Sequence, residues 1–308
     1  MRVVVTGATG LVGSALVPLL LERGDDVTVL SRDAERAAAK LGDRVRPVTA
    51  DLETPGAWTE SLAGAGAIVH LAGESIASKR WDARQKQIIR DSRVEATRTL
   101  VEEIAKLPAA DRPKTLISAS GADYYPFALP GEFDDDEVTE RDPAGDSFLA
   151  RVCRDWEREA NEARQAGLRV ATMRTGLVIA KRGGALEKMA TPFKFFVGGK
   201  LGNGKQWVPW IHLDDAAAAY ATAVHDERYQ GAINLVTDSV RNRELVRSIG
   251  RALGRPSLVP VPGFALKLAV GEMAPYLLQG RRVVPRRLRD LGFTWKHPEL
   301  DAAIGSAV

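Results

Sequence analysis

The apolar positions of this 308-residue chain follow two repeating patterns along most of its length. Short apolar runs, which are typical of buried strands, occur at 3–5, 27–30, 45–50, 67–71, 115–118, 170–173 and 232–236. Segments with apolar residues at helical spacing lie between several of these runs, around 84–106, 147–166 and 214–225. Because strands that alternate with helices form parallel sheets covered on both faces, the pattern predicts an α/β fold with a doubly wound parallel sheet.

Two stretches break this alternation. Residues 181–210 are rich in glycine and aromatic side chains, and the region from 238 to the end has helical patterns of its own and a proline-rich piece at 256–262. We therefore predict a main domain of residues 1–180, completed by 211–237. Residues 181–210 and 238–308 are expected to form a smaller lobe that encloses a substrate.

The loop after the first apolar run holds three evenly spaced glycines. Gly7 permits a tight turn, Gly10 lets a ligand approach the backbone, and Gly13 lets the following helix pack closely on the strand. Such a turn directs backbone N–H groups outward at the positive end of the helix dipole, where a pyrophosphate binds. The alternative interpretation is a turn that merely needs small residues. Since the apolar pattern fits on both sides, we predict a Rossmann-type dinucleotide site at Gly7, Thr9, Gly10, Leu11, Val12 and Gly13.

The end of the second apolar run indicates which dinucleotide is bound. Ser31 and Arg32 stand where an NAD enzyme would place an acidic residue on the ribose. A guanidinium there can bind a 2′-phosphate, which favours NADP(H) over NAD(H). The alternative is that Asp33, one position later, binds the ribose. Asp51 and Leu52, after the third run, are expected to flank the adenine.

Composition narrows the possible partners. The chain has 43 Lys and Arg against 40 Asp and Glu, a net charge of only +3, so nucleic acid is not an expected ligand. No apolar run approaches the roughly 18 residues of a membrane span. A single cysteine, Cys153, fits a reducing compartment, and no leader-like segment precedes the first strand. We expect a cytoplasmic protein that binds neither nucleic acid nor membrane. The four histidines are scattered, so no metal site is expected.

Several short motifs occur together in this chain. They lie at 6–13, 70–74, 80–81, 92–93, 118–120, 124–125, 148–150, 156–157, 174–176, 198–199 through 210–212, 277–285 and 292–293. In this combination, and over essentially its whole length, the chain resembles the epimerase/dehydratase branch of the short-chain dehydrogenase/reductase superfamily. More narrowly, it is similar to an atypical subfamily of nucleoside-diphosphate-sugar epimerases and cell-division-inhibitor-like proteins.

The resemblance implies further cofactor contacts. Leu71, Ala72 and Gly73 would line the cofactor after the fourth strand, and Arg174 and Gly176 would lie near its nicotinamide end. Both sets follow strand-like runs, and ligands of open α/β sheets bind at the carboxyl ends of the strands. The alternatives are an ordinary turn for the first set and a strand-end charge for the second.

The resemblance also exposes a gap in the chemistry. Oxidoreductases of the superfamily use a Tyr-x-x-x-Lys pair on one helix, in which the lysine lowers the tyrosine pKa so that the phenol moves a proton. This chain has Phe148 and Val152 at those two positions, and neither side chain exchanges protons. Ser120 matches the superfamily serine and is the expected polarising group. Tyr124 and Tyr125 are candidate proton donors, although one of them could merely pack on the cofactor.

Other residues near the expected site have alternative interpretations. Glu74, Arg80, Trp81 and Trp207 are candidate substrate contacts, although an Arg-Trp pair is often a packing contact. Asp123 places an acid before the tyrosine pair, where the subfamily has none.

Two functions remain open from the sequence. One is an NADP(H)-dependent oxidoreductase or epimerase-like enzyme that acts on an unidentified small molecule. The other is a catalytically silent NADP(H)-sensing protein whose ligand state alters a partner interaction. Monomer and homodimer are equally compatible with the sequence.

Overall fold

The computed structural model describes residues 1–127 and 135–308. Its centre is a parallel seven-stranded sheet with the strand order β10-β7-β5-β4-β1-β2-β3. The strands are β1 (Arg2–Thr6), β2 (Asp26–Ser31), β3 (Val45–Thr49), β4 (Ala67–His70), β5 (Thr115–Gly121), β7 (Arg169–Thr175) and β10 (Gly231–Leu235). The order reverses between β1 and β4, which confirms the predicted doubly wound α/β fold.

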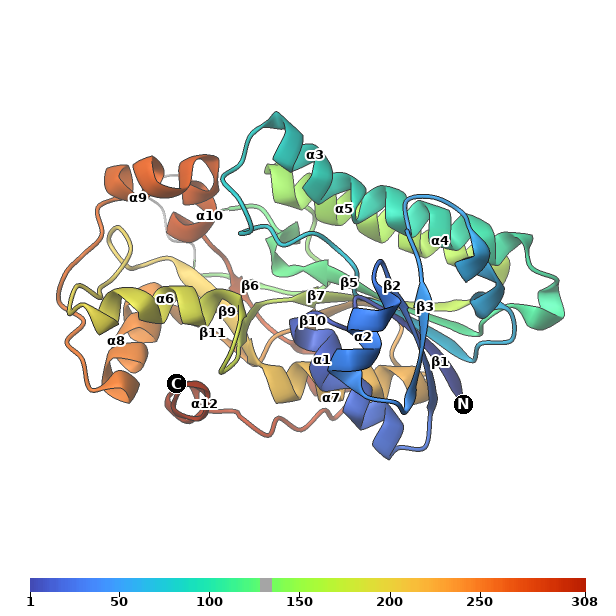
Figure 1. Cartoon of the computed structure of the whole chain (residues 1–308). Helices are drawn as coiled ribbons and strands as arrows, with labels where there is room; N and C mark the ends of the chain where they lie inside the picture. The colour runs from blue at the N-terminus through green and yellow to red at the C-terminus, as the bar shows by residue number, and fades with distance from the viewer. Residues whose placement is uncertain (128–134) are drawn as a thin grey trace.

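Helices cover both faces of this sheet (Figure 1). One face carries α3 (Ala83–Asp91), α4 (Val94–Lys106) and α5 (Phe148–Glu162), and the other carries α1 (Leu11–Glu22), α2 (Ala34–Leu41) and α7 (Leu213–His225). Strand residues alternate between the two cores. Val3 and Val5 face the α1 and α7 side, whereas Val4 faces the α4 side. The period of two along each strand thus supplies both apolar layers.

The helix predicted at 84–106 is two helices in the structure. It breaks after α3, where the Ser92 hydroxyl accepts a hydrogen bond from the backbone N–H of Glu74 at 3.0 Å and donates to the Ile89 carbonyl. A serine that bonds nearby backbone groups competes with the helical ladder, which explains the break. The break places Arg93 at the start of α4, beside the loop that follows β4.

A second, smaller layer lies at the other end of the molecule. A three-stranded sheet of β8 (Leu177–Ile179), β9 (Trp207–His212) and β11 (Asp238–Arg241) packs with the helices α6 (Gly184–Lys194), α8 (Asn242–Leu253) and α12 (Leu300–Ala307). The remaining pieces are a two-stranded pair, β6 (Glu137–Val138) and β12 (Arg282–Val283), and the helices α9 (Gly263–Val270), α10 (Ala274–Leu278) and α11 (Arg286–Asp290).

The C-terminal region does not stay within this lobe. Leu288 of α11, with Phe293 and Trp295 after it, packs on the apolar core formed by α1, α7 and the main sheet. The sequence placed residues 238–308 in the substrate lobe as a whole, but these side chains bury their apolar surface against the main domain. Among the described residues, no helix is both long and apolar enough to span a bilayer.

Candidate functional site

The glycine turn between β1 and α1 has the close contacts that a dinucleotide cradle requires. Gly7 has a φ of +66°, and a Cβ there would lie 2.6 Å from the Leu71 carbonyl carbon. A Cβ on Gly13 would lie 2.6 Å from Ala8 Cα. Gly10 is the N-cap of α1 and has no side chain to occupy the first free N–H groups of the helix. Those N–H groups remain available to an anion, so the turn fits a pyrophosphate.

The rim beside this turn carries cations. Arg32 is exposed at the end of β2, and the Lys40 ammonium of α2 donates to the Thr9 carbonyl at 2.7 Å. The Asp33 carboxylate is engaged elsewhere, since it caps α2 by accepting the Arg36 N–H at 2.9 Å. Ser31 Oγ bonds Asp33 backbone atoms within the same turn. Asp33 is therefore less available to a ribose than the sequence alone allows. Lys40 could not be identified from the sequence because its proximity depends on how α2 folds back.

Asp51 and Leu52, which were expected to flank the adenine, follow β3 directly. The Asp51 carboxylate accepts the Glu53 N–H at 3.1 Å and the Thr54 hydroxyl at 3.2 Å, so it closes its own turn. Leu52 is half-buried and packs against the core under α4. Asp51 remains exposed at the carboxyl end of β3, whereas the Leu52 side chain is apolar and partly exposed beside it.

A buried hydrogen-bond chain shapes the loop after β4. The Thr6 hydroxyl accepts the N–H groups of Leu71 and Ala72, each at 3.2 Å, and lies 2.8 Å from His70 Nδ1. His70 Nε2 lies 3.0 Å from the Thr97 hydroxyl of α4. Burial lowers the pKa of His70 to about 4, so the imidazole is neutral and can donate at one nitrogen and accept at the other. These hydrogen bonds fix the conformation of the loop at residues 71–73, which was expected to line the cofactor.

The residues expected at the nicotinamide end form a buried polar network. Arg174 donates from Nε and Nη2 to the two carboxylate oxygens of Glu157, each at 2.8 Å, and the same carboxylate accepts the Ser120 hydroxyl at 2.7 Å. Arg174 also donates to the Tyr125 hydroxyl at 2.9 Å, which in turn donates to Asn234 at 2.6 Å. All five side chains are buried.

This network gives Ser120, Arg174 and Tyr125 partners within the protein. Burial disfavours the charged form of Arg174, but its bonds to Glu157 outweigh this effect and raise its pKa above the ordinary value. Burial also raises the pKa of Tyr125 above its ordinary value. These hydrogen bonds tie β5, β7, β10 and α5 together. Glu157, which lies in one of the motifs, and Asn234 received no role from the sequence because only the tertiary structure brings them to the same strand ends.

Gly176 follows the same network at the end of β7. A Cβ there would lie 2.7 Å from the carbonyl oxygen of Pro209 in β9. The close approach that requires a glycine at this position is thus to the second sheet of the protein itself.

Tyr124 and Asp123 stand at the same strand ends with more access to solvent. Both lie in the short 3-10 turn η3 (Ala122–Tyr124) after β5 and are half-buried. The Arg174 guanidinium lies 3.4 Å from the centre of the Tyr124 ring. Burial raises the pKa of Asp123 to about 6, and the positive charge of Arg93 partly opposes this shift. Two proton-exchanging groups therefore occur beside the helix that lacks the usual pair.

Cys153 of α5 lies beside these groups but is a poor nucleophile. Its thiol is buried, and burial raises its pKa to about 12, with Asp123 and Glu157 adding to the shift. A thiol that stays protonated cannot attack a substrate. Cys153 therefore serves as a small packed side chain.

The candidate substrate residues lie around the loop after β4. Trp81 is buried against Phe148, with ring centres 5.4 Å apart, and against Tyr276 of α10, at 5.2 Å. Its indole also donates to the Ile76 carbonyl at 2.7 Å. Arg80 is exposed and lies against Gly271, just after α9. Trp81 thus packs between Phe148 of α5 and Tyr276 of the lobe, and the Arg80 guanidinium lies beside the start of the next turn of the lobe, at Gly271.

Glu74 follows this loop directly, whereas Trp207 lies in the small sheet of the lobe. Glu74 is half-buried directly after the loop, within the electrostatic reach of Arg93. Trp207 begins β9, and the Arg241 guanidinium lies 3.8 Å from its ring centre. A further contact, from the Lys188 ammonium of α6 to the Ala77 carbonyl at 2.6 Å, connects the lobe to the loop.

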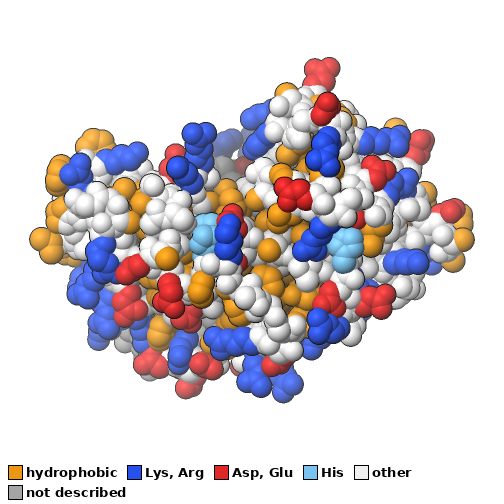
Figure 2. All heavy atoms as spheres, turned by 90° about the horizontal axis from the view of Figure 1, so that it is seen from below, with side chains coloured by type: hydrophobic (Ala, Val, Ile, Leu, Met, Phe, Trp, Pro, Cys, Tyr) orange, Lys and Arg blue, Asp and Glu red, His pale blue; other side chains and the backbone are white. Residues whose placement is uncertain are grey.

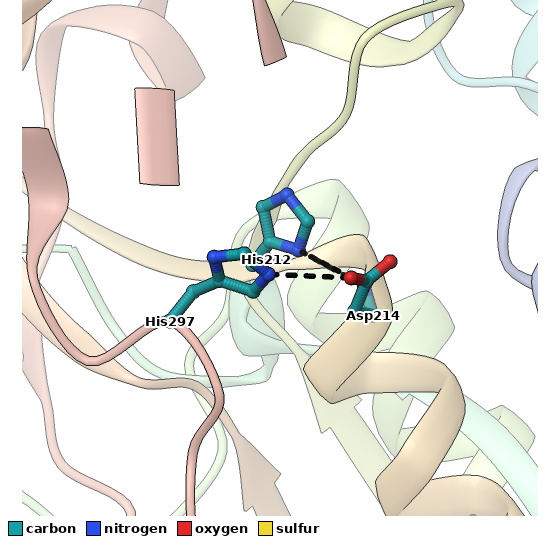
Figure 3. A group of neighbouring side chains, drawn as sticks. All are labelled: His212, Asp214 and His297. Atoms are coloured by element: carbon teal, nitrogen blue, oxygen red, sulfur yellow. Dashed lines mark hydrogen bonds and ion pairs between the residues drawn. The ribbon is translucent and has the colours of Figure 1, made fainter. Parts of the chain in front are cut away.

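One side-chain cluster had no signal in the sequence. His212, Asp214 and His297 bring three potential metal-ligand atoms within 4.8 Å of one another, although 85 positions separate the two histidines (Figure 3). The atoms already have partners, since His212 Nδ1 accepts the Asp214 N–H at 3.1 Å and the Lys296 ammonium lies 2.7 Å from Asp214 Oδ2.

The two imidazole rings also lie against each other, with centres 3.7 Å apart and planes tilted by 36°. Neighbouring Asp215 is buried and accepts the backbone N–H groups of Lys296 and His297 at 2.6 and 3.0 Å. His212 Nδ1 and His297 Nε2 both face Asp214 Oδ2, at 3.9 and 3.2 Å, and the Lys296 ammonium already pairs with that oxygen. These hydrogen bonds and ion pairs attach residues 296–297 of the C-terminal segment to the start of α7.

The chain is similar to known proteins over its whole length. The model of the NAD dependent epimerase/dehydratase family matches residues 3–235, and that of a domain of unknown function, DUF1731, matches residues 261–307. The chain is 39% identical over 305 residues to the chloroplastic epimerase family protein SDR39U1 homolog of Arabidopsis thaliana, covering 99% of this chain and 86% of that protein. It is 38% identical to the epimerase family protein SDR39U1 of Bos taurus, covering all of both chains.

Solved structures of proteins from the same family are also similar to this chain. The crystal structure of human epimerase family protein SDR39U1 (isoform 2) with NADPH has a TM-score of 0.85 at 33% identity, covering 100% of this chain and 99% of that one. UDP-glucose 4-epimerase of Thermotoga maritima, with a TM-score of 0.80 at 18% identity, shares the fold. These findings confirm the resemblance inferred from the motifs. The chain belongs to the NAD dependent epimerase/dehydratase family.

Proposed function

We propose that this chain is an NADP(H)-dependent oxidoreductase or epimerase-like enzyme that acts on a small molecule. The observation that carries the cofactor choice is the pairing at the end of β2, where Arg32 is exposed while the Asp33 carboxylate caps α2. A guanidinium binds a 2′-phosphate, and an acid in that place would repel it. The NADPH in the human SDR39U1 structure supports the same choice.

The turn at residues 7–13 would hold the pyrophosphate through the free N–H groups at the start of α1. Arg32 and Lys40 would add positive charge on the adenosine side. The loop after β4, fixed by Thr6 and His70, would support the second half of the dinucleotide. The turn, Arg32 and the loop after β4 follow the carboxyl ends of β1, β2 and β4, and the Lys40 ammonium of α2 reaches the Thr9 carbonyl in the turn.

The proposed chemistry needs a proton at the reacting oxygen. When bound, the nicotinamide would supply or accept a hydride. The Tyr124 phenol is the proton donor we favour among the candidates of the sequence, because Tyr125 is buried and donates to Asn234. Asp123 is a second proton carrier, since its pKa of about 6 leaves both protonation states populated near neutral pH. Ser120 would act as a positioning residue through Glu157.

A second function, a silent NADP(H) sensor, rests on a specific observation. Phe148 and Val152 replace the usual catalytic pair, and Trp81 packs on the Phe148 ring. A protein that only senses its cofactor needs neither proton donor nor open substrate space at this helix.

Calorimetric titration with NADPH and NADH tests the cofactor assignment. Arg32→Ala should weaken NADPH binding by roughly 10- to 100-fold and leave NADH almost unchanged, because one charge-assisted contact contributes about 1.5–3 kcal/mol. Arg154→Ala, which removes an exposed arginine from the outer part of α5, is the matched control. Equal losses for both cofactors would sink the 2′-phosphate assignment.

Turnover on aldehydes, ketones, quinones and sugar nucleotides separates the two functions. An enzyme should oxidise NADPH with at least one class, and Tyr124→Phe or Asp123→Asn should lower kcat while NADPH binding persists. Tyr125→Phe, which alters only the buried network, should lower stability and spare kcat. Tight NADPH binding without turnover on any class would favour the sensor.

A further inference from the structure

The C-terminal lobe ends in an exposed apolar surface, which we call the tip. It consists of the end of α6, the segment that leads into α9, and the outer face of α9. Its large side chains are Phe195, Phe196, Val197, Leu258, Val259, Phe264 and Leu268. Phe195, Phe264 and Leu268 are 72%, 79% and 77% exposed. Side chains of this size are normally buried, and several of them exposed on neighbouring segments indicate an interaction surface.

The pieces of the tip are held together. The Val259 N–H donates to the Gly198 carbonyl at 3.3 Å, and the Val261 N–H donates to the Lys200 carbonyl at 2.9 Å. In α9, Phe264 and Leu268 are four residues apart and share one face, while Leu266 points inward and is buried. Because Leu266 holds the opposite face of the helix against the protein, Phe264 and Leu268 point toward solvent.

Phe196 adds an independent observation. Its φ of +61° is the only positive φ of a non-glycine residue within 1–127 and 135–308. Such a backbone is strained for an aromatic residue, and strained residues concentrate at binding sites. The Arg255 guanidinium lies 4.4 Å from the Phe196 ring centre, so the exposed ring has a cation beside it.

The charges of the tip have one sign. Segments 194–200 and 255–268 contain Lys194, Lys200, Arg255 and Lys267 and no Asp or Glu. The whole chain, by contrast, is nearly balanced at +3. Figure 2, viewed from below, shows hydrophobic side chains with Lys and Arg side chains near them at the end of the molecule where the lobe lies, whereas α9 lies on the far side of that view.

We propose that the tip docks the protein reversibly on an anionic lipid bilayer surface. Phenylalanine and leucine side chains enter the boundary between headgroups and acyl chains, and lysine and arginine pair with the lipid phosphates. A symmetric contact between the tips of two copies would bring the four cations of one copy close to the same four cations of the other. Like-charge repulsion opposes such a contact. A peripheral contact of this kind needs no membrane-spanning helix, and it revises the expectation that the chain avoids membranes.

Vesicle co-sedimentation of the full chain tests the proposal. The protein should pellet with vesicles of phosphatidylcholine containing about one third phosphatidylglycerol and remain in solution with phosphatidylcholine alone. Raising the salt concentration should weaken the binding. Phe264→Ser/Leu268→Ser should lower the partition coefficient roughly 10- to 100-fold. Lys194→Glu/Lys267→Glu should remove the preference for the anionic vesicles.

The controls change exposed side chains outside the tip. Ile88→Ser on α3 and Lys114→Glu before β5 should bind as the unaltered protein does. All variants alter exposed positions and should keep their melting temperatures. The proposal fails if the unaltered protein stays in solution with both vesicles, binds both equally, or if the controls lose as much binding. It also fails if the protein is a dimer that Phe264→Ser/Leu268→Ser converts to a monomer, because the tip would then be a protein contact.

Discussion

Replacing Arg174 tests whether this residue belongs to the fold or to the cofactor. The motif resemblance placed it near the nicotinamide, but its guanidinium forms a two-point ion pair with Glu157 in the interior. Arg174→Met keeps an unbranched apolar stem and removes the charged guanidinium. The Glu157 carboxylate then stays buried with only the Ser120 hydroxyl to bond it.

The size of the effect follows from that geometry. Removing one partner of a buried ion pair costs about 3–5 kcal/mol because the other charge is left uncompensated. Domains of ordinary stability have about 5–15 kcal/mol in total, so the loss should lower the melting temperature by roughly 10 °C. The loss should be smaller at about pH 5 than at about pH 8, since protonation of the orphaned carboxyl removes its charge.

The assay is thermal and urea unfolding of three proteins, followed by circular dichroism. Arg174→Met/Glu157→Met removes both charges and should recover more than half of the single-variant loss, because two apolar groups of similar volume replace the pair. A single variant that loses less than about 1 kcal/mol would refute the reasoning. So would unchanged stability combined with a tenfold or larger loss of NADPH affinity, which would assign Arg174 to the cofactor.

Two further predictions concern the glycine turn and the chain of bonds beneath it. Gly13→Ala would place a Cβ 2.6 Å from Ala8 Cα, so it should cost about 1–3 kcal/mol and weaken NADPH binding, whereas Gly305→Ala, with open space around it, should do neither in the same unfolding and calorimetric assays. Burial lowers the pKa of His70 from 6.5 to about 4, so only the unfolded chain binds a proton as the pH falls below 6.5. Protonation of the unfolded chain should therefore cost the protein about 3 kcal/mol of stability, with no loss above about pH 6.5 and the full loss reached near pH 4. His70→Gln should show no such loss in unfolding curves over this range, and an equal slope in both proteins would contradict the assignment.

The sequence by itself determined the layers of the fold and the place of the glycine turn. Strand and helix periods are local properties, because each depends on which neighbouring side chains must face the same core. The seven predicted strands therefore match the observed ones to within a few residues. The helix break at Ser92 could not be predicted in this way, because the apolar spacing continues through it. The hydrogen bond that marks the break comes from the Glu74 N–H, in another loop.

The tertiary structure decided which polar side chains share a site. Ser120, Glu157 and Arg174 come from β5, α5 and β7, and no spacing along the chain records that their ends converge. The same is true of His212 and His297, and of the segments that form the tip. Hydrogen bonds and ion pairs act over about 3 Å and depend on how elements pack, whereas periodicity reports only which face of an element is buried. Only the tertiary structure shows that a serine and an arginine identified by motif bond the same carboxylate, that of Glu157.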